Sequence, residues 1–416
     1  MTTTNTATPK TTKKLATIHS KRSFLDAVTR LLGPRPPCEL CRPIYPFDIV
    51  WLVLAGGHVS LRAAKDGLTM SARLYMAATA NDLVNEVIPL DVGGLFDIAD
   101  AMPEDAAIVR ESSTGIDNAF TSVRFTGDRA SLNVPEACIE ETDYAPKLPE
   151  IATPTAFLPG PMLHVLERVR PAMGPGKANI KNLATHGVRL EFEGRTMRAV
   201  TTDGHRLHIA EHESAAAFPE MNPMLLPRAF VTGLYQALAE NMAHGSLPPS
   251  FFMEYGDNYV AAKVNDDVIR CDRKQGFIFP PYDHYRGLPG ERPAARVRSD
   301  EIVEYLSRVM ALRVNPYVAL TLSTDRLVCR TEVTTSNPND AFGLTLDDRF
   351  RVHYDGDTRY TKVHAEYLRE ALTACGSRVL LTFGTEQTDP ITVDGDGCKV
   401  VLMPSKYAPT DPEFAP

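Results

Sequence analysis

The sequence has no long apolar run, and it is poor in cysteine and tryptophan. Of its 416 residues, seven are cysteine and one is tryptophan. The longest apolar stretch, around Val50–Ala55, has the length of a strand, whereas a membrane-spanning helix needs about 20 apolar residues. Cysteines this sparse do not make a disulfide framework and are typical of a reducing compartment. We therefore expect a cytoplasmic protein that does not associate with membranes.

The common signatures of nucleotide binding and hydrolysis are also missing. The sequence contains no GxxxxGK[ST], GxGxxG, HExxH or GxSxG motif. Cys38 and Cys41 have the spacing of a zinc or redox pair, but no second pair lies near them. Asp203, His205 and His208 could form a metal or acid–base cluster, although on a strand His208 would point to the opposite face. We therefore expect no catalytic residue, no metal and no cofactor, and a hydrolase built on Asp203 and His205 remains an alternative.

Length, composition and charge indicate a globular chain of several domains. Apolar residues make up 44% and charged residues 23%, which is ordinary for folded proteins. A single hydrophobic core stops growing near roughly 250–300 residues, so we expect two to four domains. The formal net charge of -8 means that any contact with nucleic acid needs a local basic surface. The Thr-rich start of the chain lacks apolar periodicity, and we expect a disordered tail over residues 1–16.

The sequence repeats weakly at intervals of about 138 residues. Arg62–Gly67 resembles Arg198–Gly204, and Pro89 precedes Pro227 by 138 residues. Apolar residues at helical spacing, followed by alternating strand patterns, recur three times along the chain. The helices are expected at Phe24–Leu32, Leu90–Met102, Met162–Met173, Arg228–Ala243, Asp300–Leu312 and His364–Cys375.

These patterns predict an α+β protein made of three tandem copies of one domain, each with antiparallel strands and two helices on one face. The predicted domains span residues 17–150, 151–291 and 292–404, and residues 405–416 form a C-terminal extension.

Three short motifs then point to one family. They are Thr202–Leu207, which reads Thr-Asp-Gly-His-Arg-Leu, Phe279-Pro280 followed by Leu288-Pro289, and Val401–Pro404. Their order and spacing resemble the bacterial DNA sliding clamp, the beta subunit of DNA polymerase III, over about residues 17 to 404. The resemblance implies clamp-type domains with sheets outside and two helices per domain lining a ring. It implies a homodimer that closes head to tail, encircles duplex DNA without reading its sequence, and acts as a non-enzymatic processivity factor.

The resemblance also implies three sets of site residues. Peptide motifs of DNA polymerase, the clamp loader and repair proteins would dock in a groove between the second and third domains. The groove residues would be Thr202, Gly204, His205, Arg206, Leu207, Pro280, Arg286, Val401 and Met403. DNA contacts are expected from the basic residues Arg30, Arg42, Arg168, Lys177, Lys181 and Arg228. The contact between the two chains is expected at Ala130, Leu132, Ala311 and Leu312.

Some features depart from the family pattern. The interval between Pro280 and Leu288 is two residues longer than is usual, Gly287 stands where an apolar residue is usual, and Ser405–Pro416 continues twelve residues past the Met-Pro pair. The extension could cover the groove or be a disordered tail. A divergent clamp relative from a mobile element or resistance locus, with altered groove specificity, is therefore the second functional hypothesis.

Overall fold

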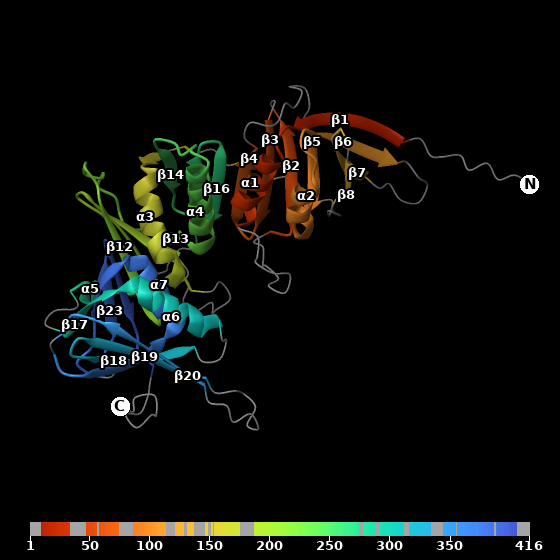
Figure 1. The fold of residues 1–416 in the computed structure, drawn as a ribbon. Coiled ribbons are helices and arrows are strands. Elements are labelled where there is room, and N and C mark those ends of the chain that lie inside the picture. Colours follow the sequence, from red (N-terminus) through yellow and green to blue (C-terminus); the bar gives the residue numbers. More distant parts are fainter. Residues whose placement is uncertain are drawn as a thin grey trace, which may run out of the picture. The chain divides into compact units, whose positions relative to one another are not determined.

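The computed structural model describes residues 10–33, 47–55, 58–74, 86–113, 121–128, 131–136, 146–148, 151–152, 154–174, 187–273, 278–287, 292–311, 316–333, 344–354, 356–386 and 388–405 (Figure 1). The chain divides into two compact units. Unit 1 contains residues 1–159 and 229–275, and unit 2 contains residues 160–228 and 276–416. The predicted second domain, 151–291, therefore contributes strands to both units.

Unit 1 contains two antiparallel sheets. The eight-stranded sheet has the order β5 (Glu86–Asp91), β2 (Ile49–Ala55), β3 (His58–Lys65), β4 (Leu68–Arg73), β16 (Asp267–Asp272), β15 (Tyr259–Val264), β14 (Phe251–Tyr255) and β9 (Thr155–Phe157). The four-stranded sheet has the order β1 (Lys10–Ile18), β6 (Ala106–Ser113), β7 (Thr121–Thr126) and β8 (Ser131–Pro135).

Unit 2 is built in the same way. Its eight-stranded sheet has the order β13 (Met224–Pro227), β10 (Gly187–Glu193), β11 (Thr196–Thr202), β12 (Arg206–Glu213), β24 (Cys398–Leu402), β23 (Ile391–Gly395), β22 (Arg378–Thr382) and β17 (Ala294–Arg298). Its four-stranded sheet has the order β20 (Leu344–Arg351), β19 (Arg326–Val333), β18 (Tyr317–Ser323) and β21 (Arg359–His364).

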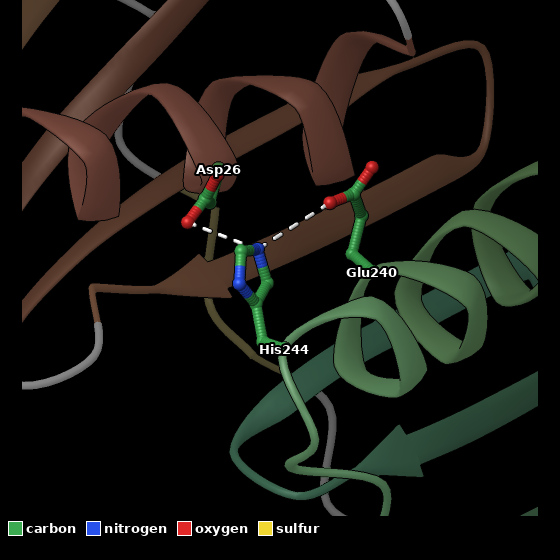
Figure 2. Close-up of side chains that lie close together, drawn as sticks. All are labelled: Asp26, Glu240 and His244. Carbon is green, nitrogen blue, oxygen red and sulfur yellow. Dashed lines mark ion pairs between the residues drawn. The ribbon is translucent and has the colours of Figure 1, made fainter.

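Most of the helices bury one face. The helices are α1 (Lys21–Leu32), α2 (Leu95–Ala101) after the 3-10 turn η1 (Val92–Gly94), and α4 (Arg228–Ala243) in unit 1, and α3 (Pro159–Val169), η2 (Arg170–Ala172), α5 (Asp283–Arg286), α6 (Ser299–Ala311) and α7 (Ala365–Cys375) in unit 2. Ser20 caps α1 by accepting a hydrogen bond from the Ser23 N–H, which satisfies one of the free donors of the first turn. α1 and α4 meet where His244 lies beside Asp26 (Figure 2).

The order of elements repeats three times along the chain. Leaving out η1, η2 and α5, each repeat runs strand, helix, four strands, helix, three strands. The repeats extend over Lys10–Pro135, Thr155–Asp272 and Ala294–Leu402, so the repeat read from the sequence is confirmed at the level of secondary structure. Gly67 and Gly204, which the sequence comparison aligned, both have a positive φ between equivalent strands, β3–β4 and β11–β12.

Two predictions about local structure are wrong. The predicted disordered tail included residues 10–16, but Lys10–Ile18 forms β1 and pairs with β6. The threonines that made this stretch look like low-complexity sequence are β-branched and favour strands. The predicted helix Leu90–Met102 begins only at Leu95, because Pro89 and Leu90 belong to β5. β5 is an edge strand, where a proline is tolerated.

Candidate peptide-binding groove

The strand β12 presents two faces with different chemistry. Leu207 and Ile209 point to one face, while Arg206 and His208 point to the other, because side chains alternate along a strand. Leu207 lies directly opposite Val401 of β24, and Arg206 lies opposite Leu402. The pairing of β12 with β24 therefore brings together the Thr202–Leu207 and Val401–Pro404 motifs, which are distant in the sequence.

The turn between β11 and β12 is held by the side chains of Thr202 and Asp203. The Thr202 hydroxyl donates to the Arg206 carbonyl at 2.6 Å and accepts from the Gly204 N–H. Asp203 accepts hydrogen bonds from the backbone N–H groups of His205 and Arg206. Gly204 has a φ of 89° and open space where a Cβ would stand, so a peptide backbone could approach it closely. Asp203 thus serves the turn, and no hydrogen bond joins it to the His205 ring in the described residues.

The face of β12 that carries Arg206 is a buried ion-pair site. The Arg206 side chain is 7% exposed, and its Nε donates to Asp203 at 3.0 Å. It also pairs with Glu370 of α7, donates to the Pro171 carbonyl, and lies 4.1 Å above the ring of Tyr367. Burial raises the pKa of the Glu370 carboxyl, although Arg206 opposes that shift. Arg206 therefore holds the β11–β12 hairpin from the face opposite Leu207 and is not exposed toward the groove.

His208 lies on this same face. Its ring is fully buried, and its Nδ1 is 2.8 Å from the carbonyl oxygen of Arg168, to which it donates. Burial lowers the pKa of His208 to about 4. The imidazole is therefore neutral at physiological pH and serves as a hydrogen-bond donor.

The opposite face forms an apolar cluster. Val200, Leu207, Ile209 and Val401 from the sheet pack together with Phe279 and Tyr282, and Leu225 and Tyr285 pack against them. Leu207 is 7% exposed and Val401 is 2% exposed. Leu207 and Val401, which the sequence predicted as groove residues, are therefore packed together with side chains from the segment 278–287.

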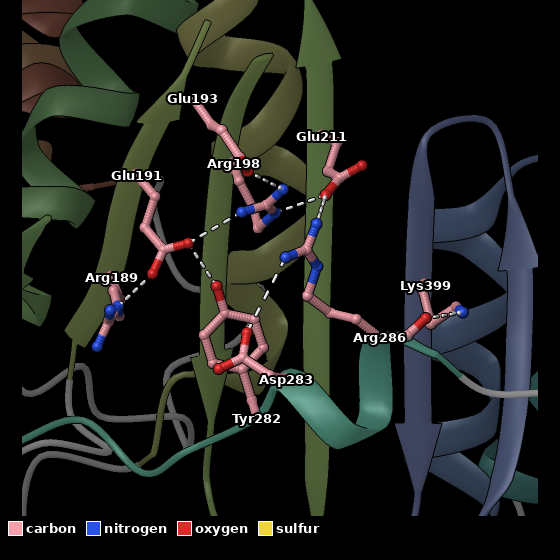
Figure 3. Close-up of polar contacts among 9 residues, drawn as sticks. All are labelled: Arg189, Glu191, Glu193, Arg198, Glu211, Tyr282, Asp283, Arg286 and Lys399. Carbon is pink, nitrogen blue, oxygen red and sulfur yellow. Dashed lines mark hydrogen bonds and ion pairs between the residues drawn. The ribbon is translucent and has the colours of Figure 1, made fainter. Parts of the chain in front are cut away.

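A network of charges fixes that segment on the sheet (Figure 3). The Tyr282 hydroxyl donates to Glu191, which also accepts from Arg189 and from Arg198 at 3.1 Å. Burial opposes ionisation of Glu191, but the hydrogen bonds from Tyr282, Arg189 and Arg198 outweigh it and lower the pKa. Arg286 of α5 lies 3.7 Å from Glu211. Tyr282 is therefore held both by its buried ring and by its hydroxyl.

The exposed part of the candidate groove lies next to the segment 278–287. The Met403 side chain is 44% exposed, and its backbone N–H donates to the His205 carbonyl at 2.9 Å. His205, Pro280 and Arg286 are exposed as well. A cavity of about 590 Å³ adjoins Ile209, Glu211, Arg286 and Lys399. A ligand approaching this site first meets Met403, His205 and the segment 278–287, whereas Leu207 is 7% exposed.

The basic residues predicted to contact DNA differ in burial and in their partners within the chain. Arg30 is 2% exposed and pairs with Asp267 at 2.8 Å, so its prediction as a DNA contact is wrong. Arg168 pairs with Asp396, and Arg228 donates to the carbonyls of Met173 and Gly174. Burial lowers the pKa of the Arg228 guanidinium. Arg42, Lys177 and Lys181 lie outside the described residues.

The predicted contact between chains is described only in part. Leu132 lies on the edge strand β8 and is half-buried, and Ala311 is exposed at the end of α6. Ala130 and Leu312 lie outside the described residues, as do Cys38, Cys41 and the extension beyond Ser405.

Several residues of the site could not be found from motifs. Glu191, Arg198 and Tyr282 become neighbours only through folding, and so do Arg206 and Tyr367 on the other face of the sheet. The one available signal was the lengthened interval after Pro280, which contains Tyr282 and Tyr285.

Several known proteins resemble this chain in sequence and in fold. No protein-family model matches the sequence. The chain is 24% identical to the beta sliding clamp of Salmonella typhimurium over 390 residues, which cover 92% of this chain and 96% of that one. It is 21% identical to the beta sliding clamp of Pseudomonas aeruginosa over 224 residues, which span 53% of this chain and only 58% of the relative. A sliding clamp from Bartonella birtlesii, solved bound to griselimycin, matches 95% of this chain and 100% of its own with a TM-score of 0.70 and 18% identity.

These likenesses define the class of protein. The chain has the sliding-clamp fold, an α+β fold with antiparallel sheets, as the sequence predicted. Its relatives are beta sliding clamps, the beta subunit of DNA polymerase III, so the resemblance inferred from three short motifs is confirmed. None of the helices over the described residues combines the length and apolarity that a bilayer crossing needs.

Proposed function

We propose that the chain is a DNA polymerase processivity factor that forms a ring from two copies and performs no catalysis. The observation that carries the proposal is the pattern of sheet edges. Within the chain, β4 pairs with β16 and β12 pairs with β24, and each pairing joins two groups of four strands into one sheet. In the repeat, β20 is the equivalent of β4 and β12, and β8 is the equivalent of β16 and β24.

Among the described residues, β8 and β20 each pair with one neighbour only. Unpaired strand edges readily pair with another chain. Pairing β8 of one chain with β20 of a second would complete an eight-stranded sheet, and doing so twice would close a head-to-tail dimer. This supports the division into three clamp domains, whose six copies would surround the hole, with Leu132 and Ala311 near the contact.

Such a ring would hold duplex DNA by enclosing it. It would need only loose contacts with phosphates and no reading of base sequence. The proposed DNA contacts that remain are Arg42, Lys177 and Lys181. Arg168 and Arg228 would contribute only through N–H groups that their contacts within the chain leave free. A net charge of -8 fits a protein that slides on DNA without binding it tightly.

The groove at Met403, His205 and Leu207 is proposed to bind short linear motifs of polymerase, clamp loader and repair proteins. A specific observation also favours the second hypothesis, a clamp relative with altered specificity. Tyr282 and its neighbours cover Leu207 and Val401, so the apolar floor is less accessible than Met403. Peptides would then bind only after Tyr282 is displaced, or would use the exposed rim alone.

Imaging and sedimentation at micromolar concentration test the ring. We expect closed rings with a duplex-sized hole and the mass of two chains. Leu132→Asp should shift the protein to monomers, because it places a charge at the β8 edge. Phe252→Asp is the matched control, since Phe252 is 43% exposed on β14 and should leave the dimer intact. A compact monomer at all concentrations would contradict the proposal.

A further inference from the structure

Three ionisable side chains from two helices converge in unit 1 (Figure 2). Asp26 comes from α1, Glu240 from the last turns of α4, and His244 directly follows α4. The His244 N–H donates to the Glu240 carbonyl at 3.1 Å, so the helical turn continues and places both side chains on one face. Asp26 faces them from the neighbouring helix.

The spacing of the three ligand atoms suits a small metal ion. His244 Nε2 lies 3.1 Å from Asp26 Oδ2 and 3.7 Å from Glu240 Oε2, and all three atoms lie within 4.8 Å of one another. A tetrahedral ion with bonds of about 2.0–2.2 Å separates its ligand atoms by about 3.3–3.6 Å. Small side-chain rotations would therefore bring one carboxylate oxygen from each acid and the imidazole nitrogen to bonding distance.

Two carboxylates share a single imidazole in this cluster. Both carboxylates approach the same nitrogen of His244, and one Nε2–H cannot donate well to two acceptors. Within the described residues, no lysine or arginine pairs with Asp26 or Glu240. Their side chains are 21% and 28% exposed, so solvent screens their repulsion only in part. A divalent cation would bind the imidazole nitrogen and one oxygen of each carboxylate, and its charge would offset theirs.

We propose that Asp26, Glu240 and His244 form a site for a divalent transition-metal ion of the zinc type. One imidazole and two carboxylates suit zinc or cobalt, whereas calcium and magnesium prefer oxygen ligands alone. Three protein ligands leave a fourth position for water. The sequence did not reveal the site, because Asp26 lies far along the chain from Glu240 and His244.

The ion would connect the two halves of the eight-stranded sheet of unit 1. α1 packs on β3 and β4 and precedes them in the first repeat, whereas α4 belongs to the second repeat. Gly233 of α4 lies close to Met70 of β4 and Ile269 of β16, where the halves join. Arg30 of α1 already pairs with Asp267 of β16 at the same junction. Metal binding should therefore stiffen the joint between repeats.

The test is titration of untagged, metal-free protein with zinc chloride by isothermal calorimetry at pH 7.5. We expect one zinc ion per chain with a micromolar dissociation constant and a rise in melting temperature on zinc addition. Cobalt in place of zinc should give the visible absorption of a tetrahedral site. Asp26→Asn and His244→Ala should each weaken zinc binding by about tenfold or more, since even changes behind the ligands of metal sites cost that much.

His19→Ala is the matched control. His19 and Asp105 form an exposed pair at 3.0 Å, and no third ligand joins them in the part of the chain that the structure describes, so this variant should bind zinc as the parent does. Absence of zinc binding, or unchanged binding in His244→Ala, would overturn the proposal. Binding that persists in His244→Ala and is lost in Cys38→Ser would overturn it as well, by assigning the ion to the cysteine pair.

Discussion

A single hexapeptide, Thr202–Leu207, performs two tasks because neighbouring residues of a strand face opposite ways. Leu207 contributes to the apolar cluster, whereas Arg206 joins the hairpin to α7 and to the Pro171 carbonyl. Thr202 and Asp203 satisfy the backbone of the turn. Much of what makes this motif recognisable is therefore structural, and only the exposed Gly204 and His205 are directly accessible to a partner.

Arg206→Ala should be strongly destabilising. It leaves Asp203 and Glu370 without their cation at a site where the arginine is 7% exposed. Removing one partner of a buried ion pair costs about 3–5 kcal/mol. Urea unfolding measures the loss, and Arg195→Ala is the control, because its pair with Glu213 is exposed and should cost about 0–1 kcal/mol. Equal effects of the two variants would contradict the buried network.

His208 predicts a pH dependence that can be isolated with His208→Gln. Burial lowers the pKa of His208 from 6.5 to about 4, so between these values the unfolded chain binds a proton that the folded chain resists. Folding therefore loses stability as the pH falls through this window, and His208→Gln does not share the loss. The stability difference should change by about 3 kcal/mol between pH 6.5 and 4. If the unfolding free energies of the two proteins changed with pH in the same way, burial would not lower the pKa of His208.

At the scale of elements, the segment 278–287 decides how open the groove is. Phe279 and Tyr282 from this segment pack in one apolar cluster with Leu207 and Val401, and the Tyr282 hydroxyl joins the charged network of Glu191 and Arg198. Arg286 adds an ion pair to Glu211 at 3.7 Å. The two residues by which the Pro280 to Leu288 interval exceeds the usual length thus lie in a segment that packs into the site.

Tyr282→Ala should increase the affinity for a peptide that carries a clamp-binding motif. Removing the Tyr282 side chain takes away its part of the apolar cluster and its hydrogen bond to Glu191, so the segment 278–287 is easier to displace from Leu207 and Val401, and we expect a gain in affinity of roughly tenfold. Fluorescence anisotropy with a labelled peptide measures it. Phe252→Ala, a change at an exposed aromatic residue on β14, should have no effect. Met403→Ala combined with Leu207→Ala should abolish binding, and unchanged affinity in that double variant would refute the groove assignment.

Sequence patterns predicted helices well where the apolar residues followed helical spacing alone. The apolar spacing of Met162–Met173 and Asp300–Leu312 gave helices whose ends agree within about four residues with α3–η2 and α6. Around Pro89 the same residues satisfied both helix and strand patterns, and pairing of β5 with β2 decided the outcome. The Glu191–Tyr282 contact and the pairing of Asp26 with His244 could not be predicted, since both depend on tertiary contacts between residues far apart in sequence.

At the scale of the whole molecule, the same strand-to-strand contact is used repeatedly. β4·β16 and β12·β24 join successive repeats inside the chain, and the proposed β8·β20 contact would use the same edges between chains. A fold that joins its own repeats edge to edge has at each end the surface needed to join a second copy. The proposed contact between two chains would thus repeat a pairing that already occurs twice within one chain.

A ring that holds DNA by enclosure should show weak, salt-sensitive direct contact that depends on few residues. Each phosphate neutralised contributes about -0.9 to the slope of log affinity against log salt. Arg42→Ala and Arg228→Ala should therefore each flatten the slope by about one contact, as measured by anisotropy with a short duplex at several salt concentrations. Arg228 has a second task, since it binds the carbonyls of Met173 and Gly174, so its variant needs a check of thermal stability. Arg30→Gln, checked for thermal stability as well, is the informative control: Arg30 is buried against Asp267, and a slope that changed in this variant would show that Arg30 contacts DNA. If neither Arg42 nor Arg228 alters the slope, the basic surface must lie elsewhere, and Lys177 and Lys181 become the residues to change.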